Sequence, residues 1–176
     1  LKQGTHLIFI SKDGYKPSDL IVEAVPGRSN PVQAKLVPVA GGVLHDHSIV
    51  IDPAFGGEEK GFVGPTGTYA ADLNLSIANY LTTYLKAAGA KVVLTRSSDT
   101  FVIPPDRVQK SEAAEADIFL SISLNSSGKQ RKNSSLVGYY PKSEKGKELA
   151  EMIQKELIFN LKGAKTGIYE DTDYII

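Results

Sequence analysis

Two patterns of hydrophobic and polar residues follow one another along this chain, and the change falls at about residue 40. Before it, short runs rich in branched residues are separated by turn residues, a pattern typical of β-strands. The expected strands are residues 6–10, 20–25 and 32–37. So few short strands bury little surface by themselves. We therefore interpret residues 1–42 as a β-rich segment that forms part of a small β-sandwich, with packing against the residues that follow as the alternative.

From residue 48 onward, apolar runs alternate with long amphipathic segments, which predicts an α/β domain. The first run, Ile49-Val50-Ile51, is continuously apolar, as expected for a strand that is covered on both faces. Further strands are expected at 91–95, 118–124 and 136–140, and the approach to another at 168–169 and 174–176. The predicted fold class is α/β, with a mixed, mostly parallel sheet flanked by helices over residues 43–176.

Three helices are expected between these strands. The first carries apolar side chains three to four residues apart, which we expect to form its buried face: Leu73, Ile77, Leu81, Leu85 and Ala88. Gly89 follows as the residue that favours the left-handed conformation at a helix end. The second helix is expected at 106–115, directly after two prolines. The third is expected around 149–157, where apolar residues recur every four positions.

The composition excludes several classes of function. Twenty Lys and Arg balance twenty Asp and Glu, so no net charge concentrates nucleic acid or an anionic membrane near the chain. The apolar runs are far shorter than the roughly 20 residues of a membrane-spanning helix, so no transmembrane segment is expected. Because the chain has no cysteine, disulfide scaffolds, thiolate metal sites and cysteine nucleophiles are excluded.

No known catalytic arrangement follows from the residues alone. His45 and His47 are two residues apart and would point the same way on a strand, but no third ligand accompanies them, so their default role is at the surface or a domain junction. No serine occupies the strand-to-helix turn of a hydrolase nucleophile. The glycine-rich stretch 55–61 matches neither a P-loop nor a dinucleotide fingerprint, and its adjacent acids Glu58 and Glu59 would repel a phosphate.

A polar cleft is expected where the parallel strands end, because ligands of α/β sheets bind outside the carboxyl ends of the strands. The side chains at these ends are Asp52, Phe55, Arg96, Ser123 and Asn125. Asp52 is the one acid among them, and an aspartate before a proline is as often a turn former as a catalyst.

The order of these segments resembles the zinc-dependent N-acetylmuramoyl-L-alanine amidases, a family of cell-wall hydrolases. The segment 48–57, with the sequence SIVIDPAFGG, is similar to that family's opening strand and loop. The resemblance continues through Asp72-Leu73-Asn74-Leu75, Arg107-Val108 and the segment 116–122. Its most specific part is the Gly-x-x-Val-x-x-Thr-Arg-x-x-Asp element that begins at Gly89.

The chain departs from this family at the positions that hold its zinc. The resemblance implies a histidine in the first loop, a glutamate at the start of the first helix and a histidine after the third strand; this chain has Phe55, Ala70 and Ser123 there. A phenyl ring and a methyl group have no donor atom, and a neutral hydroxyl is a poor substitute for imidazole. The family's catalytic glutamate falls beyond Ile176. We therefore predict that the chain has no zinc and no other cofactor.

The resulting hypothesis is an amidase-fold domain that is not catalytic and acts by binding peptidoglycan or an envelope protein. Asp52, Arg107 and Asn125 are the predicted substrate-binding residues. For Arg107, a structural ion pair with a carboxylate such as Asp99 is the favoured role.

Two alternatives remain open. The first is an active amidase that hydrolyses the bond between N-acetylmuramic acid and L-alanine with rearranged metal ligands. Glu58, Glu59 and Asp72 lie near the lost zinc site in sequence and offer carboxylates for a calcium or magnesium ion, but acids in a glycine-rich surface loop are usually only solvated. The second is a purely structural unit. The segment Leu1-Lys2-Gln3-Gly4 is no signal peptide, and we expect a processed chain or a fragment, incomplete at its C-terminus. The resemblance implies a periplasmic or extracellular location in the bacterial envelope.

Overall fold

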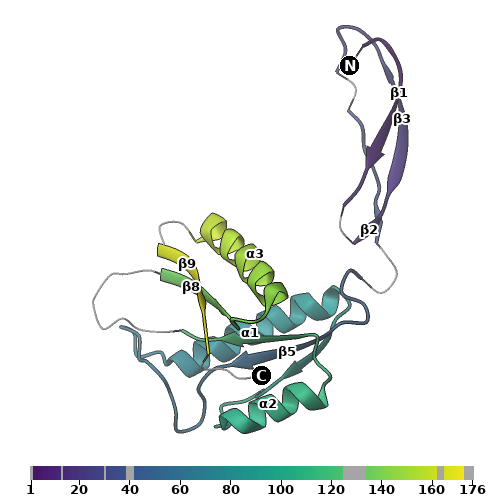
Figure 1. Cartoon of the computed structure of the whole chain (residues 1–176). Helices are drawn as coiled ribbons and strands as arrows, with labels where there is room; N and C mark the ends of the chain where they lie inside the picture. The colour runs from purple at the N-terminus through teal and green to yellow at the C-terminus, as the bar shows by residue number, and fades with distance from the viewer. Residues whose placement is uncertain are drawn as a thin grey trace. The chain divides into compact units, whose positions relative to one another are not determined.

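The computed structural model describes residues 2–12, 14–29, 31–38, 42–124, 134–161 and 165–172. The chain divides into two compact units, residues 1–124 and 125–176 (Figure 1). Within the described part, no helix combines the length and the apolar character that are needed to cross a lipid bilayer.

The first unit begins with antiparallel ribbons. β1 (Gly4–Ile10) pairs with β3 (Ser18–Ala24) over its full length. The short strands β2 (Tyr15–Lys16) and β4 (Val37–Pro38) pair in the same sense. No residue of β1 or β3 is buried, because a two-stranded ribbon has no second layer to cover either face.

These ribbons confirm the strands predicted at 6–10 and 20–25. The strand expected at 32–37 is much shorter, since its only residue within β4 is Val37. The assignment of residues 1–42 to a β-sandwich stays a prediction.

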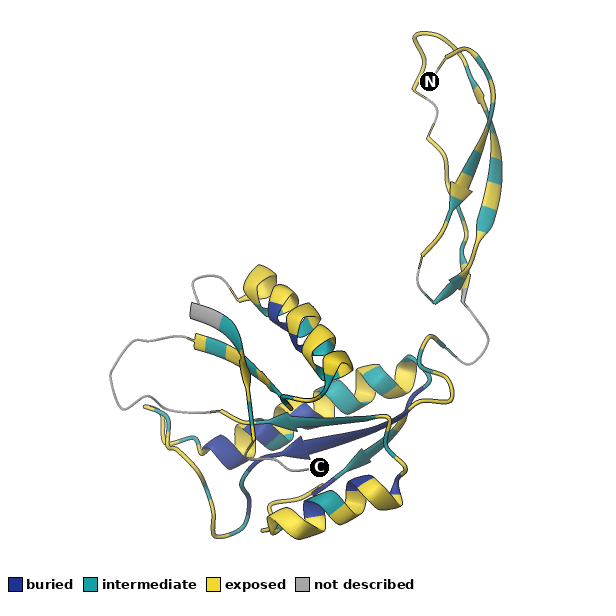
Figure 2. Cartoon of the chain, viewed as in Figure 1, coloured by how far each residue is buried: buried dark blue, intermediate teal, exposed yellow. Residues whose placement is uncertain are grey.

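A parallel sheet forms the core of the first unit. β5 (Ser48–Pro53) lies between β6 (Lys91–Leu94) and β7 (Ile118–Ile122), and both neighbours run parallel to it. Every residue of β5 is buried (Figure 2). A central strand that is covered on both faces accounts for the continuous apolar run in the sequence.

The two helices of this unit cover opposite faces of the sheet. α1 (Ala70–Ala87) packs on the face to which Ile51 points. α2 (Pro104–Ala113) lies against the other face, where its Arg107 pairs with Asp52. Successive residues of a strand point to opposite faces, so neighbouring positions of β5 contact different helices.

The buried face of α1 differs from the prediction. Leu81 and Leu85 pack against the core as expected, but Leu73 and Ile77 are 42% and 43% exposed. The fully buried residues of the helix are small or polar: Ala71, Asn74 and Ala78. A row of large apolar side chains and a row of small ones lie side by side on this helix. The row of small side chains faces the sheet, because it lets the helix backbone come closer to the strands.

Proline and glycine set the helix ends. α2 begins at Pro104, two residues before the expected start, because the fixed φ of proline suits the first turn. It ends at Ala113, shortly before Glu115 adopts a φ of +46°. Gly89, with a φ of +99°, follows the end of α1 as predicted.

The second unit is a strand–helix–strand motif. β8 (Ser134–Tyr139) and β9 (Lys165–Glu170) are parallel, and α3 (Glu144–Asn160) connects them. The Ser143 side chain caps α3 by accepting a hydrogen bond from the amide of Gly146 over 2.9 Å.

The α/β class is therefore confirmed in both units, with parallel strands and crossover helices. The fourth strand and third helix predicted from the sequence are present as β8 and α3. The expected strand at 174–176 lies outside the described residues.

Candidate functional site

The carboxyl ends of β5 and β7 bring two predicted site positions to one edge of the sheet. In the parallel pairing, Pro53 lies opposite Ile122, and the amide of Ala54 donates to the carbonyl of Ile122 over 2.9 Å. The residues that come next along the two strands, Phe55 and Ser123, therefore flank the same edge.

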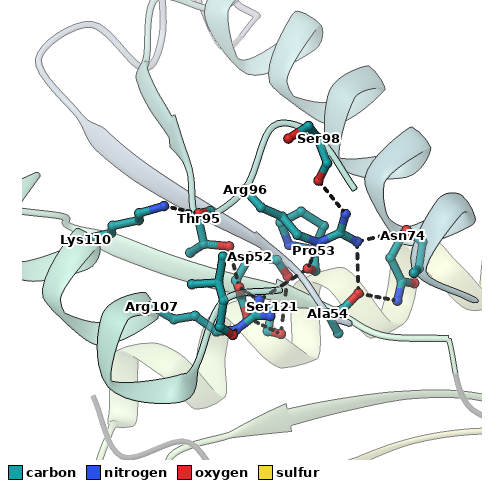
Figure 3. Close-up of polar contacts among 12 residues, drawn as sticks. Asp52, Pro53, Ala54, Asn74, Thr95, Arg96, Ser98, Arg107, Lys110 and Ser121 are labelled. Carbon is teal, nitrogen blue, oxygen red and sulfur yellow. Dashed lines mark hydrogen bonds and ion pairs between the residues drawn. The ribbon is translucent and has the colours of Figure 1, made fainter. Parts of the chain in front are cut away.

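Asp52 is the centre of a buried polar network (Figure 3). Its Oδ1 accepts hydrogen bonds from the Thr95 hydroxyl over 2.5 Å and from the Arg107 guanidinium. Its Oδ2 accepts a hydrogen bond from the Ser121 hydroxyl over 3.0 Å. The side chains of Asp52 and Arg107 are only 0% and 8% exposed. A buried carboxylate requires such partners, because an unpaired charge away from water is costly.

This geometry changes the interpretation of the predicted substrate-binding residues. Arg107 pairs with Asp52, so the expected partner Asp99 was wrong. Because both members of the pair are closed to solvent, their position favours a structural role, and ligand contact by either of them stays a prediction. The third residue, Asn125, lies outside the described residues.

Asp99 instead fixes the glycine-rich loop. Its carboxylate accepts hydrogen bonds from the amide of Gly57 over 2.9 Å and from the ammonium of Lys60. The hydrogen bond from Lys60, followed by the one from Gly57, lowers the pKa of Asp99. The same contact raises the pKa of Lys60. Both side chains remain open to solvent, so the pair contributes to loop geometry more than to overall stability.

Arg96 ties together three segments around the edge (Figure 3). Its Nε donates to the carbonyl of Pro53 over 2.8 Å. Its Nη2 donates to the carbonyls of Ala54 over 3.1 Å and Ala71 over 2.8 Å, and its Nη1 donates to the carbonyl of Ser98 over 3.1 Å. Burial is the largest cause that lowers the pKa of Arg96. One guanidinium thus fixes the end of β5 against the first turn of α1.

Asn74 makes a second link from α1 to the edge. Its Nδ2 donates to the carbonyl of Ala54 over 3.2 Å, and its Oδ1 accepts a hydrogen bond from the amide of Leu124 over 2.9 Å. Asn74 is fully buried. Arg96 and Asn74 therefore link Ala54, Ala71 and Leu124. Each of these residues is the direct neighbour in sequence of a position at which the resemblance implies a zinc ligand: Phe55, Ala70 and Ser123.

The side chains at these three positions differ in burial. Phe55 is partly buried and has a φ of +65°. Its ring meets that of Phe62 edge to face, with 6.5 Å between the centroids. Ala70 is buried as the first residue of α1, whereas Ser123 is exposed.

These side chains do not fit a zinc ion. Zinc in proteins is bound by sulfur, imidazole nitrogen or carboxylate oxygen, and phenyl and methyl groups supply none of these. Among the described residues, no group of three or more His, Asp or Glu side chains lies close enough to hold a metal ion. The structure therefore gives no support to a rearranged site, and its proposed ligands are all exposed: Glu58, Glu59 and Asp72.

The two neighbouring histidines contact carboxylates instead. His45 Nδ1 lies 2.8 Å from Asp46 Oδ2, and His47 Nδ1 lies 3.4 Å from Asp117 Oδ2. Asp117 also accepts a hydrogen bond from the amide of Ser48 over 2.8 Å, which is the main cause that lowers the pKa of Asp117. These contacts lie at the amino end of β5, at the opposite end of the strand from the candidate site.

Sequence reasoning missed Thr95, Ser121 and Asn74. The parallel register places Ser121 directly opposite Asp52, and Thr95 follows the residue that pairs with Ile51. A polar residue within or next to an otherwise apolar strand was the available signal, since a buried hydroxyl there requires a partner.

Comparison with known proteins identifies the family to which the sequence is similar. A family model described as N-acetylmuramoyl-L-alanine amidase matches residues 49–176. The N-acetylmuramoyl-L-alanine amidase LytC of Bacillus subtilis is 36% identical over 160 residues, covering 89% of this chain and 31% of LytC. YqiI of the same organism, described as uncharacterized, is 34% identical over 136 residues, covering 76% of this chain and 65% of YqiI. The chain thus spans less than two thirds of the length of either relative.

Solved structures show the same architecture. The N-acetylmuramoyl-L-alanine amidase AmiC2 of Nostoc punctiforme matches with a TM-score of 0.68 and 30% identity, over 76% of this chain and 73% of that one. The catalytic domain of CwlV from Bacillus (Paenibacillus) polymyxa matches with a TM-score of 0.67 and 31% identity, over 74% and 73%. These likenesses extend to the parallel sheet and its covering helices.

Proposed function

We propose that this chain, which belongs to the N-acetylmuramoyl-L-alanine amidase family, binds peptidoglycan in the bacterial envelope without hydrolysing it. The family is named for the amide bond between N-acetylmuramic acid and L-alanine, a linkage of the cell wall. In this function the chain still binds peptidoglycan but does not cleave the amide bond.

The donor set supports the absence of hydrolysis. A zinc-dependent amidase needs a metal-bound water whose pKa is lowered to about 7. The residues Phe55, Ala70 and Ser123 offer the metal at most one neutral hydroxyl. A single replacement would leave two strong ligands, but replacement of all three leaves no coordination sphere.

The buried scaffold supports retained binding. Arg96 makes four hydrogen bonds to backbone carbonyls, and Asn74 makes two more to backbone groups on either side of the edge. Such a satisfied buried network rigidifies the surface above it, and a rigid surface loses less entropy when it binds. In this proposal Asn125 contacts the ligand, while the Asp52–Arg107 pair holds the edge in shape from below.

Restoring the three zinc-binding side chains tests whether their replacement accounts for the loss of hydrolysis. The variant with Phe55→His, Ala70→Glu and Ser123→His is expected to bind one zinc per chain, because the scaffold still brings the three positions together. The unmodified chain and the variant that lacks only Ser123→His serve as controls, and both are expected to purify without stoichiometric zinc. Elemental analysis and competition with a chelating dye measure the metal.

Two outcomes would contradict the proposal. Stoichiometric zinc in the unmodified chain, together with release of peptides from purified peptidoglycan, would establish the active amidase. Failure of the unmodified chain to co-sediment with peptidoglycan sacculi would refute the binding role. Sacculi that were treated to remove their stem peptides separate recognition of glycan from recognition of peptide.

A further inference from the structure

A buried glutamine in the second unit has no partner for its side chain. The buried residues of α3 are Ala150 and Gln154 (Figure 2). Gln154 is 6% exposed, and neither its Nε2 nor its Oε1 has a hydrogen-bond partner among the residues that the structure describes. A carboxamide that is removed from water without partners is unfavourable. Folded proteins contain few such groups, and each one calls for a structural or functional reason.

A pocket of about 290 Å³ lies against this glutamine. Four of its lining residues lie on α3, within two turns of the helix, and the fifth lies on β9, against which α3 packs. The spacing of three, four and seven residues from the first of the four places them on one face of α3. The described lining consists of Glu151, Gln154, Lys155, Ile158 and Ile168.

The pocket combines aliphatic walls with one neutral polar group. Ile158 is 54% exposed and Ile168 is partly buried, so both leave apolar surface open to a ligand. Glu151 and Lys155 are exposed and carry opposite charges, so the lining has no net charge that would select an anion or a cation. A matching ligand carries one hydrogen-bond donor and one acceptor beside an apolar group.

One residue of an extended peptide has this character. Its N–H and C=O point to the same side, as in the hydrogen-bonded pairs of an antiparallel sheet. The carboxamide of Gln154 supplies the complement, because Oε1 accepts from the N–H and Nε2 donates to the C=O. Rotation about the terminal bond of glutamine has a broad minimum, so the carboxamide can turn toward a ligand that enters the pocket.

A sugar ring fits this lining less well than a peptide residue. It brings several hydroxyl groups, and the described lining meets them with one neutral polar side chain, that of Gln154. Hydroxyl groups that lose water without gaining a partner oppose binding. An apolar peptide residue instead brings one donor, one acceptor and an aliphatic side chain.

We propose that the pocket lined by α3 and β9 binds one apolar residue of an extended peptide. Gln154 forms hydrogen bonds with the N–H and C=O of that residue, and Ile158 and Ile168 pack against its side chain. This inference goes beyond the proposed function, because the pocket lies in the second unit and has its own ligand. It also explains why the chain keeps a buried glutamine that lowers its stability, since binding sites commonly trade stability for function.

The test is an NMR titration of the full chain with the capped tripeptide acetyl-alanyl-leucyl-alanine amide. We expect the backbone signals of Ile158 and Ile168 and the side-chain NH₂ signal of Gln154 to shift. Gln154→Met should weaken binding at least about tenfold, because both hydrogen bonds are lost. The matched control is Phe159→Ala, since Phe159 is 80% exposed on α3 and does not line the pocket. Its effect on binding is expected to stay below about twofold.

The melting temperature of Gln154→Met separates loss of the site from loss of the fold. Methionine has a similar volume and no group that needs a partner, so this variant should melt at a higher temperature than the unmodified chain while it binds more weakly. A lower melting temperature would mean that the glutamine is satisfied in the folded chain, which overturns the premise.

A matched probe tests the hydrogen bond from the ligand. In the corresponding depsipeptide an ester oxygen replaces the leucine N–H, and we expect it to bind at least about fivefold more weakly than the tripeptide. The proposal is refuted if the tripeptide does not bind, if Gln154→Met binds it as well as the unmodified chain, or if an oligomer of N-acetylglucosamine shifts the same signals and the tripeptide does not. The last result would assign the pocket to a sugar.

Discussion

Substitution of Arg107 by methionine removes the cation from the buried pair with Asp52 and keeps a side chain of similar length. The Asp52 carboxylate is 0% exposed, so water cannot replace the lost partner. It keeps the hydrogen bonds from the Thr95 and Ser121 hydroxyls. The carbonyl of Val102, which accepts a hydrogen bond from Arg107 Nε over 2.9 Å, also loses its donor.

The magnitude follows from these contacts. Breaking a buried ion pair by removal of one partner costs about 3–5 kcal/mol, and the two remaining hydroxyl donors place this case near the lower end, at about 3 kcal/mol. Replacing Asp52 by asparagine at the same time removes the uncompensated charge. We therefore expect the double variant to be about 1–2 kcal/mol more stable than the sum of the single effects predicts.

Urea unfolding followed by far-UV circular dichroism measures these changes, provided that the m-value is unchanged. The control is Arg28→Met, because Arg28 is exposed in the turn region after β3. Its effect is expected to stay within about 0.5 kcal/mol. A loss below about 1 kcal/mol for Arg107→Met, or strictly additive effects in the double variant, would refute the structural role of the pair.

Three further predictions concern other contacts. The pKa of Asp99 is lowered by Lys60 and Gly57, so its contribution to stability is present at neutral pH and is lost as the pH falls through the folded-state pKa. In Asp99→Asn, the melting temperature should therefore fall less steeply than in the unmodified chain when it is measured from pH 6 downward. Gln154 is buried, and neither its Nε2 nor its Oε1 has a hydrogen-bond partner among the residues that the structure describes, so Gln154→Met should stabilise the chain by about 1 kcal/mol in thermal unfolding. Arg96→Lys keeps the charge but cannot span four carbonyls, and urea unfolding should show a loss of about 2–3 kcal/mol.

The sequence pattern predicted most of the fold because periodicity reports local geometry. The continuous apolar run identified β5 as a buried strand. The role of Asp52 at its end was harder to predict, because the residues that pair with its carboxylate lie far away in sequence. Arg107 lies 55 residues from Asp52, and no periodicity reveals such a register. A nearer acid, Asp99, was therefore the expected partner.

Helix α1 shows the other limit of periodicity. A stripe of large apolar residues and a stripe of small residues are both compatible with its sequence, and the spacing favoured the large ones. Packing selected the stripe with Asn74, because its amide satisfies two backbone groups at the edge of the sheet. A choice that depends on tertiary hydrogen bonds cannot be made from one helix alone.

The backbone at position 55 permits a test of whether the loop or its residue dictates the conformation there. The amides and carbonyls of Gly56 and Glu59 bond to each other over 2.7 and 3.2 Å, so the turn after Phe55 is closed without any contribution from the phenyl ring. If the loop imposes the φ of +65°, an alanine at position 55 carries a left-handed penalty of about 1–2 kcal/mol that glycine avoids. The greater freedom of glycine in the unfolded chain offsets about 0.4–1 kcal/mol of this difference. Phe55→Gly should therefore be more stable than Phe55→Ala by about 0.5–1 kcal/mol, measured by urea unfolding of the two variants side by side. The opposite order would mean that the loop relaxes to a right-handed conformation once the ring is removed, and that Phe55 itself holds the loop in place.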